Sequence, residues 1–539
     1  MRLWGAHGQM AMEETHVALL NASPAGTEAM KNLVLPGIGS FTVVDAKTVD
    51  QNDLANNFFV QVGDVGSSRA ECVTKLLQEL NEHVAGKFVD EDISQVLEAR
   101  PDFLDPFKLV IATQMSAGDL RMVAHKCAER SIPLLVTQCY GLVGTLRVLL
   151  NEHYVVESHP EHPFPDLRVL APPAELVHFV KDRYSNLCEL ASADYAHIPY
   201  VAILLKAVGE WSAANNGQMP SSYQHKKELR SIIEKYRRPG VQADQNINEA
   251  LTALNTALSL PSPSVSTRAV LESARERVTE LAAWIHSHNT SKDGPDMSVR
   301  RKDLSFWLMA AAVNAFVNSE GKGMLPTNGA IPDMTTHTET YVALQQVYQA
   351  QAAADLSAVM AHLQHITMQE SLSLDLIDHE RLKIFCKNAQ HIALLSYRSM
   401  EDEYETGLVK TSTITSALDD GASAGTLYVL LRSAEAFYAQ RSHWPGANDV
   451  ESDVPVFKYF VGDVLKDLNI SFGNSPCPIS DDWIHEFCRW GGGELHSIAA
   501  LIGGVAAQEA IKAITQQYIP LNNTFIFNGA NGSASVLEI

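Results

Sequence analysis

Short apolar runs alternate with helix-like segments along residues 1–158. The runs are apolar throughout, which is typical of parallel strands buried on both faces of a sheet. They span Val17–Leu20, Phe41–Val44, Leu109–Ala112 and Pro133–Val136, and helical periodicity appears between them at Thr27–Leu35, Arg69–Leu80 and Met122–Arg130. This order of elements predicts a doubly wound α/β domain.

Helical periodicity dominates residues 159–480, and its longest segments are Leu304–Val317, Tyr341–Leu363 and Thr426–Tyr438. The α/β pattern then returns, with a helix predicted over Ile498–Ile514 and strands near Tyr518–Leu521 and Thr524–Phe527. We therefore expect residues 1–158 and 481–539 to fold together. Residues 159–480 are predicted to form a large, mostly helical insertion.

The loop after the first predicted strand decides whether the domain binds a nucleotide. A working loop is rich in glycine, so that backbone N–H groups can approach phosphate. Here only Gly26 remains, and Pro24 has no N–H to donate. Asp45 still ends the second strand, where an acidic side chain would bind ribose hydroxyls. We interpret Gly26 and Asp45 as a vestigial nucleotide site, with a working site as the alternative.

Charge limits the partners of the chain. It carries 63 Asp and Glu residues against 41 Lys and Arg, a formal net charge of −22. Such a chain repels phosphate backbones and anionic lipids, so we expect neither a nucleic acid nor a membrane partner. The seven cysteines include no C-x-x-C pair, which predicts reduced thiols in the cytoplasm or nucleus.

Residues that could carry catalysis are scarce in the sequence. Gly421–Gly425 has the letters of a G-x-S-x-G elbow, but a polar segment rather than a buried strand precedes it. Cys477 lies between two prolines without a base nearby in sequence. The histidines lack acidic or cysteine partners at metal-ligand spacing. We predict no catalytic residue and no metal site in this chain.

Gly503 and Gly504 interrupt the last predicted helix. A glycine inside a helix costs about 1 kcal/mol relative to alanine. We predict that another backbone packs closely against both positions.

Strings in three regions of the sequence resemble one family. RLWGAHGQ and KNLVLPGIGSFTVVD stand near the start, LPTNGAIPDM in the middle, and HEFCRWGGGELHSIAALIGGVAAQEAIKAIT and NNTFIFNG near the end. In the same order, they are similar to the regulatory subunits of neddylation-activating enzymes, within the superfamily of ubiquitin-like activating enzymes. The resemblance covers nearly the whole chain.

This resemblance implies a Rossmann-like adenylation fold that is inactive and pairs with a catalytic subunit. That partner would bind ATP and Mg and carry the nucleophilic cysteine, so no cofactor is expected on this chain. A ubiquitin-like modifier and its conjugating enzyme are the further partners implied. The family's contact segment maps onto Pro332–Gln345, with the interface residues Pro332, Asp333, Met334, Tyr341, Leu344 and Gln345.

The sequence departs from the family at its start. Family members usually begin Tyr-Asp-Arg-Gln, and that arginine reaches the partner's ATP site. This sequence begins Met1-Arg2-Leu3, so Arg2 aligns with a later position and is only a candidate for a residual N-terminal arginine. Three alternatives stay open: a regulatory subunit of the SUMO type, a stand-alone adenylating enzyme, and a pure adaptor of the same fold.

Overall fold

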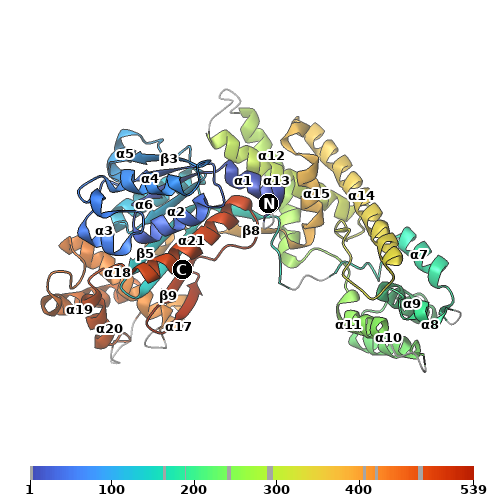
Figure 1. Cartoon of the computed structure of the whole chain (residues 1–539). Helices are drawn as coiled ribbons and strands as arrows, with labels where there is room; N and C mark the ends of the chain where they lie inside the picture. The colour runs from blue at the N-terminus through green and yellow to red at the C-terminus, as the bar shows by residue number, and fades with distance from the viewer. Residues whose placement is uncertain are drawn as a thin grey trace. The chain divides into compact units, whose positions relative to one another are not determined.

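The computed structural model describes residues 4–161, 165–187, 190–238, 244–287, 295–404, 408–418, 423–470 and 477–539. Two compact units make up the chain (Figure 1). The first combines Met1–Val155 with Leu394–Ile539, and the second is Val156–Ala393.

A mixed sheet forms the centre of the first unit. Within the described residues it has eight strands in the order β10-β9-β6-β5-β4-β1-β2-β3. The strands are β1 (His16–Leu20), β2 (Ser40–Val44), β3 (Ala85–Val89), β4 (Leu109–Thr113), β5 (Leu134–Tyr140), β6 (Val143–Leu149), β9 (Thr524–Asn528) and β10 (Ser533–Leu537). The strands from β3 to β5 run parallel, and β6, β9 and β10 continue the sheet in antiparallel pairs. The predicted doubly wound α/β fold is confirmed.

Helices cover both faces of this sheet. Val17 and Leu19 of β1 enter one core together with α2 and α21, whereas Ala18 and Leu20 enter another together with α5 and α6. Apolar residues at every position of the strand satisfy both cores at once. The helices of this unit are α1 (Gly5–Glu13), α2 (Pro24–Val34), α3 (Gln51–Asn56), α4 (Arg69–Glu79), α5 (Ile93–Ala99), α6 (Ala117–Glu129), α16 (Met400–Tyr404), α17 (Thr411–Ser416), α18 (Ala424–Arg441), α19 (Val450–Asp467), α20 (Asp481–Trp490) and α21 (His496–Thr515).

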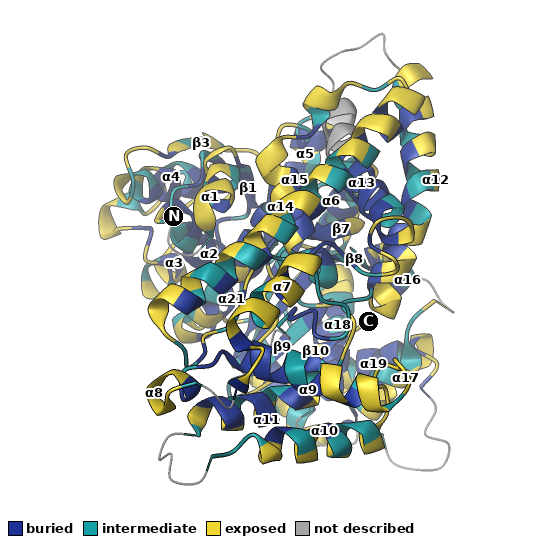
Figure 2. Ribbon diagram, turned by 90° about the vertical axis from the view of Figure 1, so that its right-hand side faces the viewer, coloured by how far each residue is buried: buried dark blue, intermediate teal, exposed yellow. Residues whose placement is uncertain are grey.

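The second unit is mostly helical. Its helices are α7 (Ala174–Tyr184), α8 (Ser192–Tyr195), α9 (Tyr200–Ala214), α10 (Tyr223–Lys235), α11 (Gln245–Ala257), α12 (Val265–Ser287), α13 (Pro295–Asn318), α14 (Thr338–Gln369) and α15 (His379–Lys387). The longest, α14, buries Leu344, Tyr348, Val359 and Leu363 along one side, and most of the residues between them are exposed or half-buried. Figure 2 shows this one-sided burial along α12 and α14. A short pair of strands, β7 (Glu152–Val155) and β8 (Ala393–Ser396), stands where the chain leaves and re-enters the first unit.

The insertion ends earlier than the sequence pattern suggested. We placed its end at residue 480, but residues from Leu394 onward belong to the first unit. The reason is a shared core, in which Phe437 of α18, Phe457 of α19 and Phe487 of α20 pack with Tyr140 of β5 and Ile526 of β9. Helical periodicity locates a helix but does not say which core its apolar face joins.

The strand predicted near Tyr518–Leu521 is wrong. Side chains hold this segment instead of a strand ladder: Tyr397 Oη donates to the Pro520 carbonyl at 3.2 Å, and the Leu521 N–H donates to Glu509 Oε2 at 2.8 Å. The strand predicted at Thr524–Phe527 is present as β9. The pattern missed β3 and β10, whose residues are mostly exposed at the two edges of the sheet.

Helices α2 and α21 pack against each other and bring the two ends of the chain together. A Cβ atom at Gly503 would lie 2.6 Å from Glu28 Cβ and 2.8 Å from the Ala25 carbonyl oxygen, both on α2. The predicted close backbone approach is therefore confirmed at Gly503. At Gly504 it is wrong, because a Cβ there would meet nothing within 4 Å. Although α21 is long and apolar enough to cross a membrane, most of it is buried inside the protein.

The two adjacent glycines provide a matched test of this packing. Gly503→Ala should lower the free energy of unfolding by about 1–3 kcal/mol, because the new methyl group overpacks the contact with α2. Gly504→Ala should raise it by up to about 1 kcal/mol, because alanine favours the helix and has free space. Urea denaturation of the full chain measures both changes. Equal effects of the two substitutions would contradict the packing described.

Candidate functional site

The carboxyl ends of the parallel strands meet where the strand order reverses, between β1 and β4. In doubly wound folds, ligands bind at this crevice. Here the protein's own side chains bridge it. Asn21, which follows β1 with a φ of +63°, donates from Nδ2 to the Thr113 carbonyl at 3.0 Å. Gln114, which follows β4, donates from Nε2 to the Cys139 carbonyl at 2.9 Å and accepts from the Cys139 N–H at 3.1 Å.

Two backbone donors of the loop before α2 are also occupied. Ser23 is the N-cap of α2, and its hydroxyl accepts from the Gly26 N–H at 3.3 Å. The Ala22 N–H donates to Asp45 Oδ2 at 2.8 Å. Gly26 serves packing, because a Cβ there would lie 2.7 Å from Leu19 Cδ1 and 2.9 Å from Thr113 Cγ2. The remaining glycine thus lets α2 approach the sheet.

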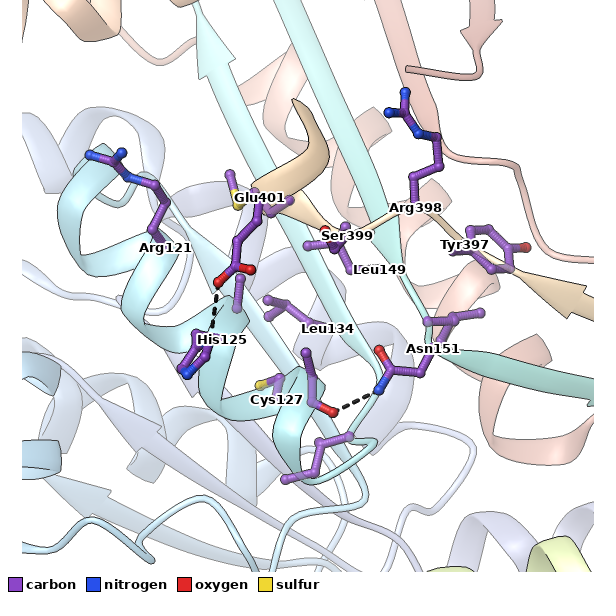
Figure 3. A pocket seen from close by; sticks show the side chains of 15 residues that line it. Arg121, His125, Cys127, Leu134, Leu149, Asn151, Tyr397, Arg398, Ser399 and Glu401 are labelled. Carbon is purple, nitrogen blue, oxygen red and sulfur yellow. Dashed lines mark hydrogen bonds and ion pairs between the residues drawn. The ribbon is translucent and has the colours of Figure 1, made fainter. Parts of the chain in front are cut away.

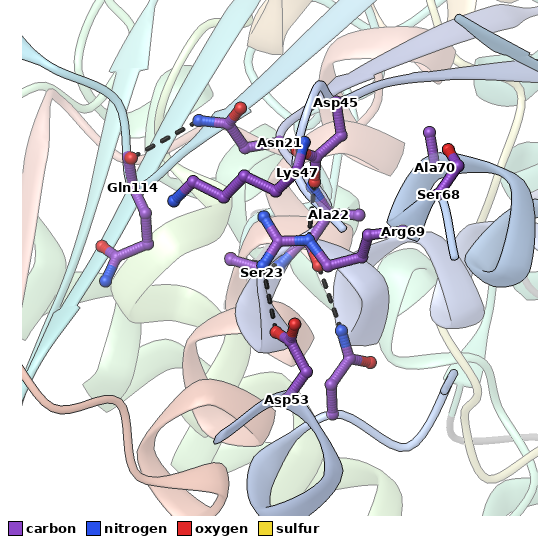
Figure 4. Close-up of polar contacts among 12 residues, drawn as sticks. Asn21, Ala22, Ser23, Asp45, Lys47, Asp53, Ser68, Arg69, Ala70 and Gln114 are labelled. Atoms are coloured by element: carbon purple, nitrogen blue, oxygen red, sulfur yellow. Dashed lines mark hydrogen bonds and ion pairs between the residues drawn. The ribbon is translucent and has the colours of Figure 1, made fainter. Parts of the chain in front are cut away.

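Asp45 is buried, with 1% of its surface exposed, and the carboxylate is held on three sides. Arg69 Nε donates to Asp45 Oδ2 at 2.7 Å, and the Lys47 N–H donates to Oδ1 at 2.9 Å. Arg69 Nη1 also donates to Asp53 Oδ1 at 3.0 Å. Figure 4 shows the guanidinium of Arg69 beside both carboxylates, next to Ala22 and Ser23.

These contacts decide whether the residues fit a nucleotide. A ribose would need the Asp45 carboxylate, which Arg69 and the Ala22 N–H already bind. A phosphate would need free N–H groups on the loop, of which Ala22 and Gly26 use theirs and Pro24 has none. These contacts leave the Asp45 carboxylate and the N–H groups of Ala22 and Gly26 unavailable to ATP.

Residues 491–496 of the C-terminal segment lie along the same edge of the sheet. The Gly141 N–H, just after β5, donates to the Gly493 carbonyl at 2.7 Å, and Asn56 Nδ2 donates to the Glu494 carbonyl at 3.1 Å. Burial raises the pKa of Glu494 to about 7, although a hydrogen bond from Gln114 and the charge of Arg69 lower it. The C-terminal segment therefore also covers the crevice, in addition to the side chains that bridge it.

The buried cysteines among the described residues lack the setting of a nucleophile. Burial raises the pKa of Cys127, Cys386 and Cys488 to about 12, and it raises the pKa of Cys139 further. A thiolate needs a lowered pKa to attack at neutral pH. Cys188 lies outside the described residues. Among the described residues, no group of three His, Cys, Asp or Glu side chains is arranged to hold a metal ion.

The structure assigns two of the six predicted interface residues to the interior of the second unit. Met334 and Leu344, 8% and 1% exposed, pack in its hydrophobic core, so their side chains cannot face a partner. Asp333 is exposed and Tyr341 is half-buried, with its hydroxyl donating to the Ile331 carbonyl at 3.4 Å. Apolar residues at helical spacing suit an interface and a core equally well, which is why sequence could not separate them.

Pro332 and Gln345 are half-buried. Contact of the segment Pro332–Gln345 with a partner stays a prediction. Arg2 lies outside the described residues.

Sequence reasoning missed Arg69 and Asp53, which complete the closed crevice. One signal was available for Arg69. It occupies the first turn of α4, where the helix dipole disfavours a positive charge. An arginine at that position indicates carboxylate partners elsewhere in the fold.

The cavities of the first unit lie away from this crevice. One of about 70 Å³ lies between α6 and residues 397–401, near the amino-terminal end of β5 (Figure 3). Its floor is apolar, with Cys127, Leu134 and Leu149. Two pairs close part of its polar rim: His125 Nδ1 lies 3.0 Å from Glu401 Oε1, and Asn151 Nδ2 donates to the Ala128 carbonyl at 2.6 Å.

Known proteins match the chain over its whole length. The model of the ThiF family matches residues 1–539. The full chain is 36% identical to the NEDD8-activating enzyme E1 regulatory subunit of Danio rerio and covers 97% of it. It is also 36% identical to the NEDD8-activating enzyme E1 regulatory subunit AXR1 of Arabidopsis thaliana, covering 95% of that protein. The corresponding subunit of Caenorhabditis elegans is 30% identical over 98% of this chain and 96% of its own length.

The fold and the closed crevice, together with the family match, define a ThiF-type protein whose nucleotide crevice is filled by its own side chains. With this identity to curated relatives over its full length, the chain belongs to the family of NEDD8-activating enzyme E1 regulatory subunits. The resemblance noted in the sequence is thereby confirmed.

Replacing Arg69 tests the closed crevice. Arg69→Met should lower the free energy of unfolding by about 3–5 kcal/mol, because it leaves two buried carboxylates without their cation. Lys75→Met on the same helix is the matched control. Lys75 pairs with Glu71 on the surface, and such a pair contributes about 0–1 kcal/mol. Chemical denaturation measures both variants.

Calorimetry on the unmodified chain completes this test. The chain alone should give no heat of binding with ATP, because Asp45 and the N–H groups of Ala22 and Gly26 are occupied and Pro24 has no N–H. Micromolar ATP binding, or an Arg69→Met variant as stable as Lys75→Met, would refute the closed crevice.

Proposed function

We propose that this chain is the non-catalytic half of a heterodimeric activating enzyme in neddylation, and that its partner performs the chemistry. The observation that carries the proposal is the Asp45 carboxylate, held by Arg69 and by the N–H of Ala22. A fold that keeps its architecture while its own side chains fill the crevice is suited to binding other proteins rather than to catalysis. The catalytic subunit then supplies ATP, Mg and the reactive cysteine.

The proposed reaction has two steps on the partner. The C-terminal carboxylate of the modifier attacks the α-phosphate of ATP, which forms an acyl-adenylate and releases pyrophosphate. The thiolate of the partner's cysteine then attacks the acyl carbon and displaces AMP, and the resulting thioester passes to a conjugating enzyme for transfer to cullins. This chain contributes surfaces that hold the modifier and the conjugating enzyme.

Two features separate this proposal from its alternatives. A stand-alone adenylating enzyme needs a nucleotide crevice, which side chains fill here. A pure adaptor would bind partners without supporting activation. The names of the relatives, which are subunits of an activating enzyme, favour the heterodimer.

A thioester assay with the reconstituted heterodimer tests the division of roles. Cys477 is the described cysteine that is not fully buried, so it is the thiol to remove first. Cys477→Ser should leave the rate of modifier thioester formation unchanged within about twofold, because the attacking thiolate needs a lowered pKa that the partner's site provides. Replacing the partner's cysteine is the control that abolishes the signal.

Two results would overturn the proposal. One is a reducible modifier adduct that maps to this chain. The other is full activity of the catalytic subunit without this chain, which would favour the adaptor.

Contact between Pro332–Gln345 and the catalytic subunit can be tested with an exposed valine. Val342 lies in this segment and is 44% exposed, whereas Val265 at the start of α12 is 90% exposed outside it. Val342→Glu should weaken co-purification at least tenfold, because a buried unpaired charge opposes association by more than 1.4 kcal/mol. Val265→Glu is the control and should leave co-purification unchanged. Undiminished co-purification of a folded Val342→Glu variant would exclude this segment from the interface.

A further inference from the structure

A second cavity of about 70 Å³ lies within the first unit, on the face of the sheet covered by α6, α16 and α18. Residues of β5, β6 and β9 form its floor, and none of them takes part in the closed crevice. Its walls are mostly apolar, but they also carry four charged side chains. Two arginines, Arg147 and Arg432, and two glutamates, Glu403 and Glu435, line it.

Arg147 on β6 is the group that the fold leaves incompletely bonded. Its side chain is 8% exposed, and Nη1 pairs with Glu403 and lies 3.5 Å from Thr524 Oγ1. Its other two nitrogens, Nε and Nη2, are buried and have no hydrogen-bond partner within the protein. A buried donor left without a partner costs about 1–3 kcal/mol, and more when it is charged.

Those two nitrogens lie on one edge of the guanidinium plane. Their N–H groups point in parallel, with the spacing of two oxygens on one carboxylate or phosphate. The free edge therefore has the shape that recognises an oxyanion.

The neighbouring side chains do not satisfy this edge. Glu403 accepts from Tyr428 Oη and pairs with Nη1 of Arg147. Glu435 Oε2 accepts from Tyr404 Oη at 3.2 Å. Arg432 lies over the Tyr404 ring at 4.2 Å and donates to the Glu403 carbonyl at 3.2 Å.

The charges around the cavity favour an anion over a cation. Two guanidinium groups face two carboxyl groups, and burial, with the nearby charge of Glu403, raises the pKa of Glu435 to about 7. Below that pH Glu435 is neutral, and the positive charges outnumber the negative ones. Tyr404 and Tyr428 stay neutral throughout, because burial raises both of their pKa values well above 10.

We propose that this cavity is a binding site for a compact oxyanion, a small carboxylate or a tetrahedral anion, which Arg147 grips through Nε and Nη2. A water molecule needs about 10–15 Å³ measured in this way, so the cavity admits an anion of a few heavy atoms and excludes a nucleotide. Thr145, which also lines the cavity, offers a hydroxyl beside the arginine.

Acetate and sulfate are the probes for the two shapes of anion. Thermal unfolding of the full chain should shift to higher temperature with millimolar acetate or sulfate, compared with chloride at equal ionic strength. Arg147→Lys keeps the positive charge but loses the paired edge, so it should weaken binding at least tenfold. Arg489→Lys is the control, because Arg489 forms an exposed pair with Glu486. It should bind as the unmodified chain does.

The pH dependence separates this site from a general salt effect. Acetate binding should weaken as the pH rises through about 7, where Glu435 becomes charged. Glu435→Gln should remove that dependence and keep binding strong above pH 7, and it tests the site even if Arg147→Lys fails to fold. Two results would overturn the proposal. One is the absence of any shift with both anions, which would mean that the cavity holds only water, and the other is equal binding by Arg147→Lys.

Discussion

A buried guanidinium between two carboxylates determines what the α/β unit can do. Arg69 joins the end of β2 through Asp45 to α3 through Asp53, and Asp45 in turn fixes the loop before α2. The end of β2, α3, the start of α4 and the loop before α2 are thus bonded to one another. Removing one member of such a buried network leaves uncompensated charge, which costs several kcal/mol. The crevice is closed by the same contacts that stabilise the surrounding loops.

The packing of α2 on α21 explains how the unit tolerates a large insertion. The two helices come from opposite ends of the sequence, and Gly503 allows their backbones to approach closely. The entropic cost of closing a loop rises only slowly with its length. The contact between α2 and α21 can therefore hold the sheet together even though a large helical unit is inserted between them in the sequence. The helical unit keeps a separate core, which includes Leu167, Trp211 and Leu344.

Much of this fold was predictable from sequence, and the exceptions have physical causes. The strands β1, β2, β4 and β5 contain short apolar runs with both faces buried, so the hydrophobic pattern found them. The pattern missed β6, which is also buried but is interrupted by Gly144 and Arg147. The edge strands β3 and β10 bury one side at most and gave no comparable signal. The end of the insertion was misplaced because the helical periodicity around Phe437 and Phe457 does not show which core they join. Met334 and Leu344 were assigned to an interface by the family resemblance, and their helical spacing suits a core equally well.

The sequence predicted an inactive nucleotide site from the missing glycines of its phosphate loop. It did not predict Arg69, the residue that stabilises the closed crevice. The missing glycines and Pro24 indicated a degraded phosphate loop, and Asp45 looked like a remnant without a purpose. The structure gives Asp45 a role that no local pattern encodes, because its partner Arg69 lies 24 residues further along the chain, beyond α3. Interactions of this kind depend on tertiary geometry, so they become visible only in the fold.

The same pair also explains why Asp45 persists without a ribose to bind. Losing Asp45 alone would leave Arg69 buried with one carboxylate, and losing Arg69 alone would leave Asp45 buried without a cation. Either loss is costly, although replacing a buried ion pair as a whole by apolar residues can be neutral. A single substitution therefore destabilises the unit before it could reopen the crevice, and two or more must coincide with changes in the loop. In this chain, the contacts that close the crevice are therefore also contacts on which the stability of the fold depends.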